Sequence, residues 1–237
     1  MSTPAPARDL AELESSVVDC RRCARLVEWR EQVAREKRRA YVDEDYWGRP
    51  VPGFGDPTAS LLIVGLAPGA HGANRTGRMF TGDRSGEVLY ASLHRCGIAD
   101  RPASVSRDDG MLLTGAWITA PVRCAPPANR PTTEERDACA PFLARELELL
   151  PWRAVLALGA FGWDAVVRHV GSDGPRPRFG HGARATLSDG RPLIGSYHVS
   201  QQNTFTGRLT PDMLDDVVRV AMRLADLEPT ASTGGRA

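Results

Sequence analysis

Lysine is almost missing from this chain: of its 30 lysine and arginine residues, Lys37 is the single lysine. A reaction that passes through a Schiff base on a lysine amine therefore has one candidate. Long apolar runs are missing too, and no stretch approaches the roughly 18–20 residues that a membrane-spanning helix needs. The first ten residues, MSTPAPARDL, lack the basic and apolar regions of a secretory signal. We therefore expect no membrane span and predict a cytoplasmic protein.

The rest of the composition is typical of a globular protein, with 42% hydrophobic and 25% charged residues in a chain of 237. No repeat or linker divides the chain, so we predict one domain over residues 1–227 and a disordered tail over 228–237. The net charge of +1 does not by itself indicate a nucleic-acid partner. Arginine can bind phosphate in a bidentate way, but a GC-rich genome explains the same excess of arginine.

Apolar runs alternate with helical patterns along the chain. The runs at 60–65, 116–122, 153–158 and 193–197 are typical of buried strands. Helical patterns span residues 10–39, 85–96, 133–150, 160–170 and 210–227, and the first is interrupted at Cys20 and Cys23. Ser85 can cap the second of these helices, and Thr132 or Thr133 can cap the third. Residues 173–192 fit a hairpin or long loop. This alternation predicts a three-layer α/β/α sandwich with a central, mainly parallel four-stranded sheet.

The segment from Gly65 to Asp83, GLAPGAHGANRTGRMFTGD, follows the first predicted strand and holds five glycines within nineteen residues. Glycine permits positive φ and a close approach of a ligand to main-chain N–H groups. Open α/β sheets bind their ligands in loops at the carboxyl ends of the strands. Because the spacing fits neither the dinucleotide nor the phosphate-loop fingerprint, an ordinary strand-to-helix connection stays an alternative.

The cysteines are grouped along the chain. Cys20 and Cys23 form a C-x-x-C hook, Cys124 begins a proline-rich loop, and Cys139 lies in the helix predicted after it. A cytoplasmic protein does not rely on disulfides, so grouped cysteines indicate a metal. Four thiolates suit a tetrahedral zinc or an iron–sulfur cluster, and the spacing does not separate the two. Buried cysteines that serve as small apolar residues are the alternative, and Cys96 is expected to be one of these.

A second polar loop, HVSQQNT over residues 198–204, follows the last predicted strand. It should open at the same sheet edge as the glycine-rich segment, because the predicted strands are parallel. A lone histidine in such a loop can be structural. Together with Asp83 and Asn129, however, His198 and Asn203 indicate a ligand site at this edge.

The sequence resembles the uracil-DNA glycosylase superfamily, specifically its family 5 branch. Three motifs carry the resemblance: GLAPGAHGANRTGRMFTGD at 65–83, VRCAPPANRPTTEE at 122–135 and SYHVSQQNTFTGRLT at 196–210. The stretch WGRPVPGFGDP at 47–57 is similar to the lead-in to the first motif of that family. The four grouped cysteines also fall where the cluster-containing branches place theirs. The resemblance covers roughly residues 17–225.

The resemblance implies a DNA repair enzyme that hydrolyses the N-glycosidic bond of uracil and of other deaminated bases such as hypoxanthine. It also implies a structural [4Fe–4S] cluster bound by Cys20, Cys23, Cys124 and Cys139. Other branches of the superfamily place a polar residue early in the first motif to handle water. This chain has Leu66 and Ala67 there, and in family 5 the task belongs to the aspartate that matches Asp83.

Four residues receive catalytic roles from this resemblance. Asp83 would orient water and stabilise the cationic sugar, and His198 would donate a hydrogen bond to the departing base. The amide of Asn129 would bind the polar edge of the base, and Asn203 would position DNA or the water. The predicted base-binding residues are Ala67, Gly69, Ala70, His71 and Phe80, and the predicted phosphate-binding residues are Arg75, Arg78 and Arg208.

The position of Lys37, in the charged N-terminal helix and far in sequence from both polar loops, predicts a monofunctional enzyme that leaves an abasic site. We expect it to act as a monomer on damaged DNA, in the cytoplasm and at the nucleoid. Two other interpretations stay open. One is a non-catalytic iron–sulfur protein that binds DNA or transfers electrons, and the other is a zinc-stabilised hydrolase of nucleotides.

Overall fold

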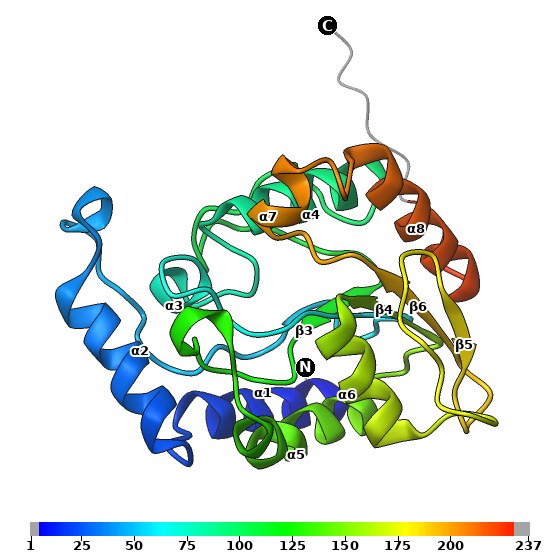
Figure 1. Cartoon of the computed structure of the whole chain (residues 1–237), viewed down its shortest axis with the longest axis horizontal. Coiled ribbons are helices and arrows are strands. Elements are labelled where there is room, and N and C mark those ends of the chain that lie inside the picture. Colours follow the sequence, from blue (N-terminus) through cyan, green and yellow to red (C-terminus); the bar gives the residue numbers. More distant parts are fainter. Residues whose placement is uncertain (1–4, 230–237) are drawn as a thin grey trace, which may run out of the picture.

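Six strands form one sheet at the centre of the computed structural model, which describes residues 5–229 (Figure 1). The strands β3, β2, β4 and β6 are parallel, and β1 and β5 pair antiparallel at the two edges. The predicted parallel sheet is thus confirmed, with a short strand added at each side. Across the sheet the order is β1 (Phe54–Gly55), β3 (Ala116–Thr119), β2 (Leu61–Val64), β4 (Ala154–Leu158), β6 (Pro192–Ser196) and β5 (Arg184–Thr186).

Helices cover both faces of the sheet, as Figure 1 shows, which confirms the three-layer prediction. One face carries α4 (Arg84–Arg95) and α8 (Pro211–Leu224). The other carries α5 (Thr133–Leu149) and α6 (Ala160–Val170), with α1 (Ala5–Val18) along α5. The shorter elements are α2 (Ala24–Glu36), α3 (Ala73–Thr76), α7 (Gln201–Phe205) and two 3₁₀ turns, η1 (Arg39–Tyr41) and η2 (Pro127–Asn129).

The central strands are buried on both faces, and β2 shows how the sequence produces this. Leu61 and Ile63 join the apolar cluster under α4 and α8, whereas Leu62 and Val64 join the cluster under α5 and α6. Successive side chains of a strand point to opposite faces, so a continuous apolar run is the pattern of a sheet that is covered twice. Burial of each such side chain contributes about 1.5–3 kcal/mol before entropy is subtracted.

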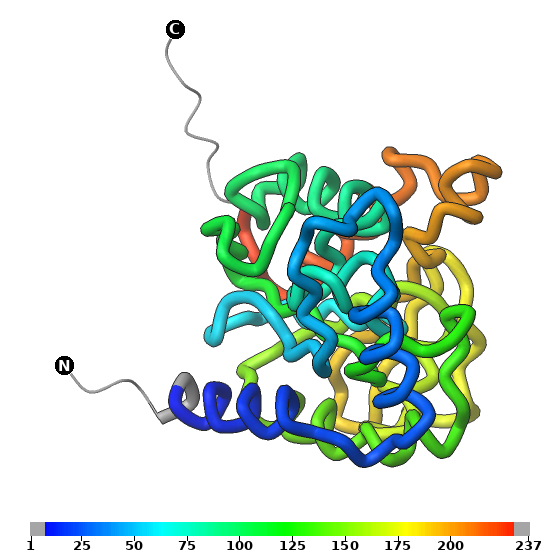
Figure 2. The backbone as a smooth tube through the Cα atoms, turned by 90° about the vertical axis from the view of Figure 1, so that its left-hand side faces the viewer, coloured from blue at the N-terminus to red at the C-terminus, as the bar shows by residue number. Residues whose placement is uncertain are grey.

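The parallel arrangement brings the carboxyl ends of four strands to one edge of the sheet. The glycine-rich segment follows β2, the Cys124 loop follows β3, Gly159 follows β4 and the His198 loop follows β6. The chain from α2 to residue 50, blue in Figure 2, crosses in front of this edge. There the amide of Trp47 donates to Arg75 O over 2.8 Å, which ties the crossing segment to the glycine-rich loop.

Asp83, not Ser85, is the N-cap of α4, because its extended backbone lets the carboxylate accept the amide of Gly86. The residues around Cys20 and Cys23 separate two helices, α1 and α2. Of the predicted disordered tail, residues 230–237 lie outside the described part of the chain. No helix within residues 5–229 is long and apolar enough to cross a membrane.

Candidate active site

The glycine-rich loop is held in shape by its own polar side chains. Arg75 is buried, and its guanidinium donates to His71 O over 2.9 Å and to Gly82 O over 2.7 Å, which joins the two halves of the loop. The same side chain pairs with Glu44 and stacks over the ring of Tyr41. Arg75 therefore serves the loop itself, and its guanidinium is occupied by internal partners rather than directed to a phosphate.

Asp83 lies at the end of this loop and at the start of α4. Its Oδ1 accepts a hydrogen bond of 3.0 Å from the amide of Gly86. Burial raises the pKa of Asp83 above its ordinary value, although the amides of Gly86 and Ser85 and the charge of Arg75 oppose this shift. The hydrogen bond to the helix fixes the position of the Asp83 carboxylate, and burial makes its ionised form less favourable. Both properties are typical of a functional carboxylate.

The loop approaches Asp83 so closely that two glycines are required beside it. A Cβ at Gly69 would lie 2.7 Å from Asp83 Oδ2, and a Cβ at Gly72 would overlap the same carboxylate. The glycines thus allow backbone and carboxylate to come into direct contact. This close approach explains why the sequence has glycine at these positions near the aspartate.

Replacement of Gly72 by alanine should disturb the aspartate and the loop together. We expect Gly72→Ala to lower the free energy of unfolding by about 1–3 kcal/mol, as overpacking of a buried site does. Gly180→Ala is the control, because a Cβ at Gly180 would meet its nearest neighbour, Ala183 Cβ, at an ordinary 3.6 Å. Urea denaturation of both variants measures the difference. Equal stability of the two would contradict the close approach.

His198 and Phe80 face each other across the site. Their ring centroids are 6.1 Å apart, and the Phe80 ring also lies against the backbone of Gly65. Phe80 has a φ of 53°, a left-handed conformation that costs energy in a residue with a side chain. Burial lowers the pKa of His198 to about 4, so its imidazole is neutral at ordinary pH. The structure thus gathers a fixed carboxylate, an aromatic face and a neutral imidazole at one edge of the sheet.

The two asparagines predicted as catalytic differ in their surroundings. The side-chain amide of Asn203 donates to His198 O over 2.8 Å and so fixes the backbone that carries the imidazole. Asn129 is exposed in the turn after Cys124, and both it and Ala128 have left-handed φ values of 55° and 53°. Two such residues in a row give this turn a specific and strained shape. No described contact joins Asn129 to Asp83 or His198.

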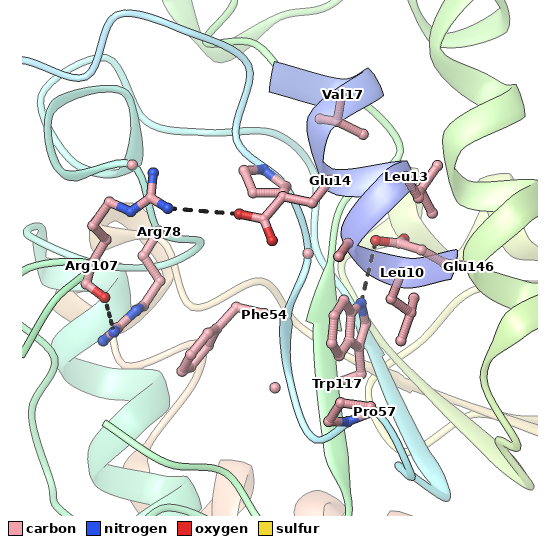
Figure 3. A pocket seen from close by; sticks show the side chains of 15 residues that line it. Leu10, Leu13, Glu14, Val17, Phe54, Pro57, Arg78, Arg107, Trp117 and Glu146 are labelled. Carbon is pink, nitrogen blue, oxygen red and sulfur yellow. Dashed lines mark hydrogen bonds and ion pairs between the residues drawn. The ribbon is translucent and has the colours of Figure 1, made fainter. Parts of the chain in front are cut away.

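Arg78, predicted to bind phosphate, is instead buried beside a separate cavity of about 290 Å³ between α1 and β1 (Figure 3). Its guanidinium hydrogen-bonds Arg107 O, pairs with Asp109 and stacks over Phe54. These contacts hold the loop over residues 99–113 against the glycine-rich loop. Arg208, by contrast, is exposed and lies over the ring of Tyr197, next to His198.

Tyr46 and His71 form a pair that sequence reasoning missed. Tyr46 Oη lies 3.0 Å from His71 Nδ1 and accepts the amide of Arg38. The Tyr46 hydroxyl thus bridges the main chain at Arg38 and the imidazole of His71 in the glycine-rich loop. Burial and two arginines lower the pKa of His71, so it is neutral. The signal in the sequence was weak, because Tyr46 lies 25 residues before its partner.

The four grouped cysteines, Cys20, Cys23, Cys124 and Cys139, line one small cavity. They come from the turn between α1 and α2, the loop after β3, and α5. Within residues 5–229, no group of three or more His, Cys, Asp or Glu side chains is placed to hold a metal ion. Burial raises the pKa of Cys124 to about 11 and of Cys139 to about 12. Both are therefore thiols here, and binding of a metal would release protons.

The cysteine cavity and the glycine-rich loop share an apolar contact. Cys124 packs with Leu26 and Val122, and Ala67 of the glycine-rich loop packs against the same group. A change in the cysteine cavity would therefore reach a residue that was predicted to bind the base.

Comparison with known proteins finds a family and several relatives. The family model described as the uracil DNA glycosylase superfamily matches residues 52–221. A "Type-5 uracil-DNA glycosylase" of Mycobacterium tuberculosis is 56% identical over 225 residues, covering 94% of this chain and 84% of that protein. A "Type-5 uracil-DNA glycosylase" of Thermus thermophilus is 54% identical over 209 residues, covering 88% of this chain and 94% of that protein. A "Type-4 uracil-DNA glycosylase" of Pyrobaculum aerophilum is 36% identical over 127 residues, covering 53% of this chain and 57% of that protein.

Proposed function

Because the chain belongs to the uracil DNA glycosylase superfamily, we propose that it hydrolyses the N-glycosidic bond of uracil in DNA. The observation that carries the proposal is the pair of Phe80 and the neutral His198 at the carboxyl edge of the sheet, with Asp83 against the same glycine-rich loop. The products are the free base and an abasic site. Hypoxanthine and other deaminated bases belong to the same proposal.

The chemistry needs a nucleotide that has left the base stack, which costs a few kcal/mol and is easiest at a mismatch. The face of Phe80 would stack on the extruded base. As the glycosidic bond breaks, negative charge develops on the base and positive charge on the sugar. The neutral His198 donates a hydrogen bond to the departing base, and the Asp83 carboxylate orients water and stabilises the cationic sugar.

A monofunctional outcome and a broad choice of bases are both supported by particular residues. Lys37 lies at the end of α2, and its ammonium donates a hydrogen bond to Val42 O. Its amine is therefore not among the groups that surround Asp83. Leu66 and Ala67 carry no group that could exclude a base by an unmatched hydrogen bond. Discrimination that lacks such groups is weak, and this supports acceptance of more than one damaged base.

DNA would meet the surface beside His198. Phe205 of α7 is 73% exposed, which is unusual for a large apolar side chain. Arg208 lies 4.4 Å from the ring of Tyr197, and Tyr197 lies 5.2 Å from the ring of His181 in the loop before β5. An exposed arginine next to an aromatic surface is suited to a phosphate and to stacked bases. We propose Phe205 as the side chain that enters the DNA.

Arg208→Gln should weaken DNA binding through one phosphate. We expect the slope of log Kd against log salt concentration to fall by about 1, with little change in the single-turnover rate at saturating enzyme. Arg223→Gln, an exposed arginine in the last turn of α8, is the matched control and should keep the wild-type slope. A slope for Arg208→Gln that equals that of the control would remove Arg208 from the DNA surface.

A [4Fe–4S] cluster held by Cys20, Cys23, Cys124 and Cys139 is part of this proposal. The cavity they line fits an anionic group: Arg123 also lines it, and its buried Nε and Nη1 have no hydrogen-bond partner. When bound, such a cluster supplies a cross-link between the segment that carries the C-x-x-C hook and the loop after β3. Through the contact with Ala67, this cross-link would steady the glycine-rich loop.

The decisive experiment incubates the purified protein with duplexes that carry uracil, hypoxanthine, xanthine or thymine opposite each base. Hot alkali then cleaves the strand wherever a base has been removed. We expect cleavage at uracil and none at thymine, with no strand scission before alkali. Tight binding without cleavage would favour a non-catalytic DNA-binding protein. Light scattering of the same sample tests the expected monomer, and metal analysis separates iron from zinc.

A further inference from the structure

Two fully buried arginines adjoin the cysteine cavity, and each has guanidinium N–H groups that lack a hydrogen-bond partner. Arg30 of α2 is 2% exposed and Arg123 of the loop after β3 is 1% exposed. A buried charge is strongly destabilising unless an opposite charge and hydrogen bonds compensate it. The partners of each guanidinium therefore show what the site is built to hold.

Arg30 contacts a cysteine rather than a carboxylate. Its Nη1 lies 2.9 Å from Cys124 Sγ, and both terminal nitrogens donate to Cys20 O at 3.3 Å. Its Nε has no partner. The nearest carboxylate, Glu31, is 3.9 Å away and is already engaged by Arg21. Arg30 is thus a buried cation whose short contacts are a cysteine sulfur and a main-chain carbonyl, and its pair with Glu31 is long.

Arg123 has an ion-pair partner for its charge but lacks hydrogen-bond partners for two of its three guanidinium nitrogens. Its Nη2 pairs with the buried Glu146, which also accepts from Thr119 Oγ1 over 2.6 Å. Its Nε and Nη1 remain without partners, although the side chain lines the cavity of the cysteines. Both arginines thus leave N–H groups unpaired beside the sulfur atoms.

We propose that Arg30 and Arg123 form a cationic clamp that donates hydrogen bonds to the cysteine thiolates and so holds an anionic iron–sulfur cluster inside the protein. The inference rests on the proposed cluster and assigns its stability to two residues that are not ligands. Four thiolates leave such a cluster with net negative charge, and hydrogen bonds to its sulfur atoms raise its reduction potential. The Arg123–Glu146 pair orients one half of the clamp.

The test compares three variants of the reconstituted, cluster-bearing protein: Arg30→Gln, Arg30→Lys and Arg35→Gln. Arg35 is the control, because it is an exposed arginine of the same helix. Absorbance near 400 nm, together with iron and sulfide content, follows loss of the cluster in air with a chelator. We expect Arg30→Gln to lose it about 10- to 100-fold faster than the wild type. Arg30→Lys keeps the charge and should be intermediate, and Arg35→Gln should match the wild type.

A second measurement separates the clamp from simple packing. In the reconstituted protein, Arg30→Gln should lower Tm and shift the midpoint potential of the cluster to a more negative value. After the cluster has been removed, the same variant should unfold at the wild-type temperature or above it, because it no longer buries an unmatched cation. An equal loss of Tm in both states would overturn the clamp and leave Arg30 as a packing residue.

The outcomes distinguish this inference from the proposed function. Wild-type rates of cluster loss in Arg30→Gln would overturn the clamp while uracil excision and the cluster stand. A wild-type protein that takes up no iron and sulfide would overturn both the cluster and the clamp. The alkali assay with uracil duplexes reports on the glycosylase activity independently in each of these cases.

Discussion

Asp83→Asn should remove most base excision and leave the fold intact. The expected loss in single-turnover rate is roughly 10²–10⁴-fold, the range of a positioned acid–base group. Asparagine is as good an N-cap as aspartate, so its side-chain oxygen can still accept the amide of Gly86. The substitution therefore removes the charge and keeps the start of α4. Single-turnover excision of uracil and a thermal melt measure the two effects.

Asp83→Ala serves as the matched comparison, because it removes charge and cap together. It should cost about 0.5–2 kcal/mol of stability in addition to the activity. Asp83→Asn, in contrast, should unfold at the wild-type temperature or above it, since a desolvated charge has been removed. An Asp83→Asn enzyme with wild-type turnover would show that another group handles the water.

The pH profile gives a further check on this assignment. Because burial raises the pKa of Asp83, its ionised form is lost at a higher pH than that of an exposed aspartate. The rate should therefore fall on the acid side of the profile. That acid limb should vanish from the residual activity of Asp83→Asn. A limb that persists in the variant would belong to another residue.

His198→Ala should slow excision by roughly 10²–10³-fold, the typical cost of losing one donor that stabilises charge in the transition state. Binding of uracil-containing DNA should change much less, because the charge on the base develops as the bond breaks. A neutral imidazole can donate throughout the ordinary pH range, since its pKa is about 4. Single-turnover kinetics and a binding isotherm separate the two quantities. An unchanged chemical step would exclude His198 as the donor.

His198 also makes the stability depend on pH, in a direction that can be worked out. Its pKa is lowered from 6.5 to about 4, so between these values the unfolded chain binds more protons than the folded one. The free energy of unfolding must then fall as the pH is lowered through this window. Loss of the imidazole in His198→Ala should flatten that dependence.

The layout of the fold could be read from the sequence because buried parallel strands are continuous apolar runs. Residues 61–64 and 154–158 are examples, and both matched the predicted runs within one residue. The edge strand β5 lies within residues 173–192, which were predicted to be a hairpin or long loop, and it pairs antiparallel with β6. The edge strand β1 was missed because its two residues are too few to give a pattern. The cap of α4 was placed at Ser85 because either polar residue can cap, and only the backbone at Asp83 decides.

The site was predictable in its loops but not in the partners of its side chains. Asp83, Phe80 and His198 follow from motif position, and their roles stay predictions. Arg75 and Arg78 illustrate the limit, because an arginine in a motif looks the same whether it faces DNA or binds a carbonyl. Arg30, in contrast, does leave a signal in the sequence: it shares a helical face with Leu26, Val27 and Val33, and a charge on an apolar face indicates a buried partner.

The short edge strands have a consequence for the behaviour of the protein in concentrated solution. A long, flat edge offers a row of free N–H and C=O groups on which another chain can build, and this leads to aggregation. Here β1 offers two residues and β5 three, and β5 carries the exposed Arg184. Such edges give a second molecule little to pair with. The apolar central strands, which would promote aggregation if they were exposed, therefore do not pair with strands of other molecules.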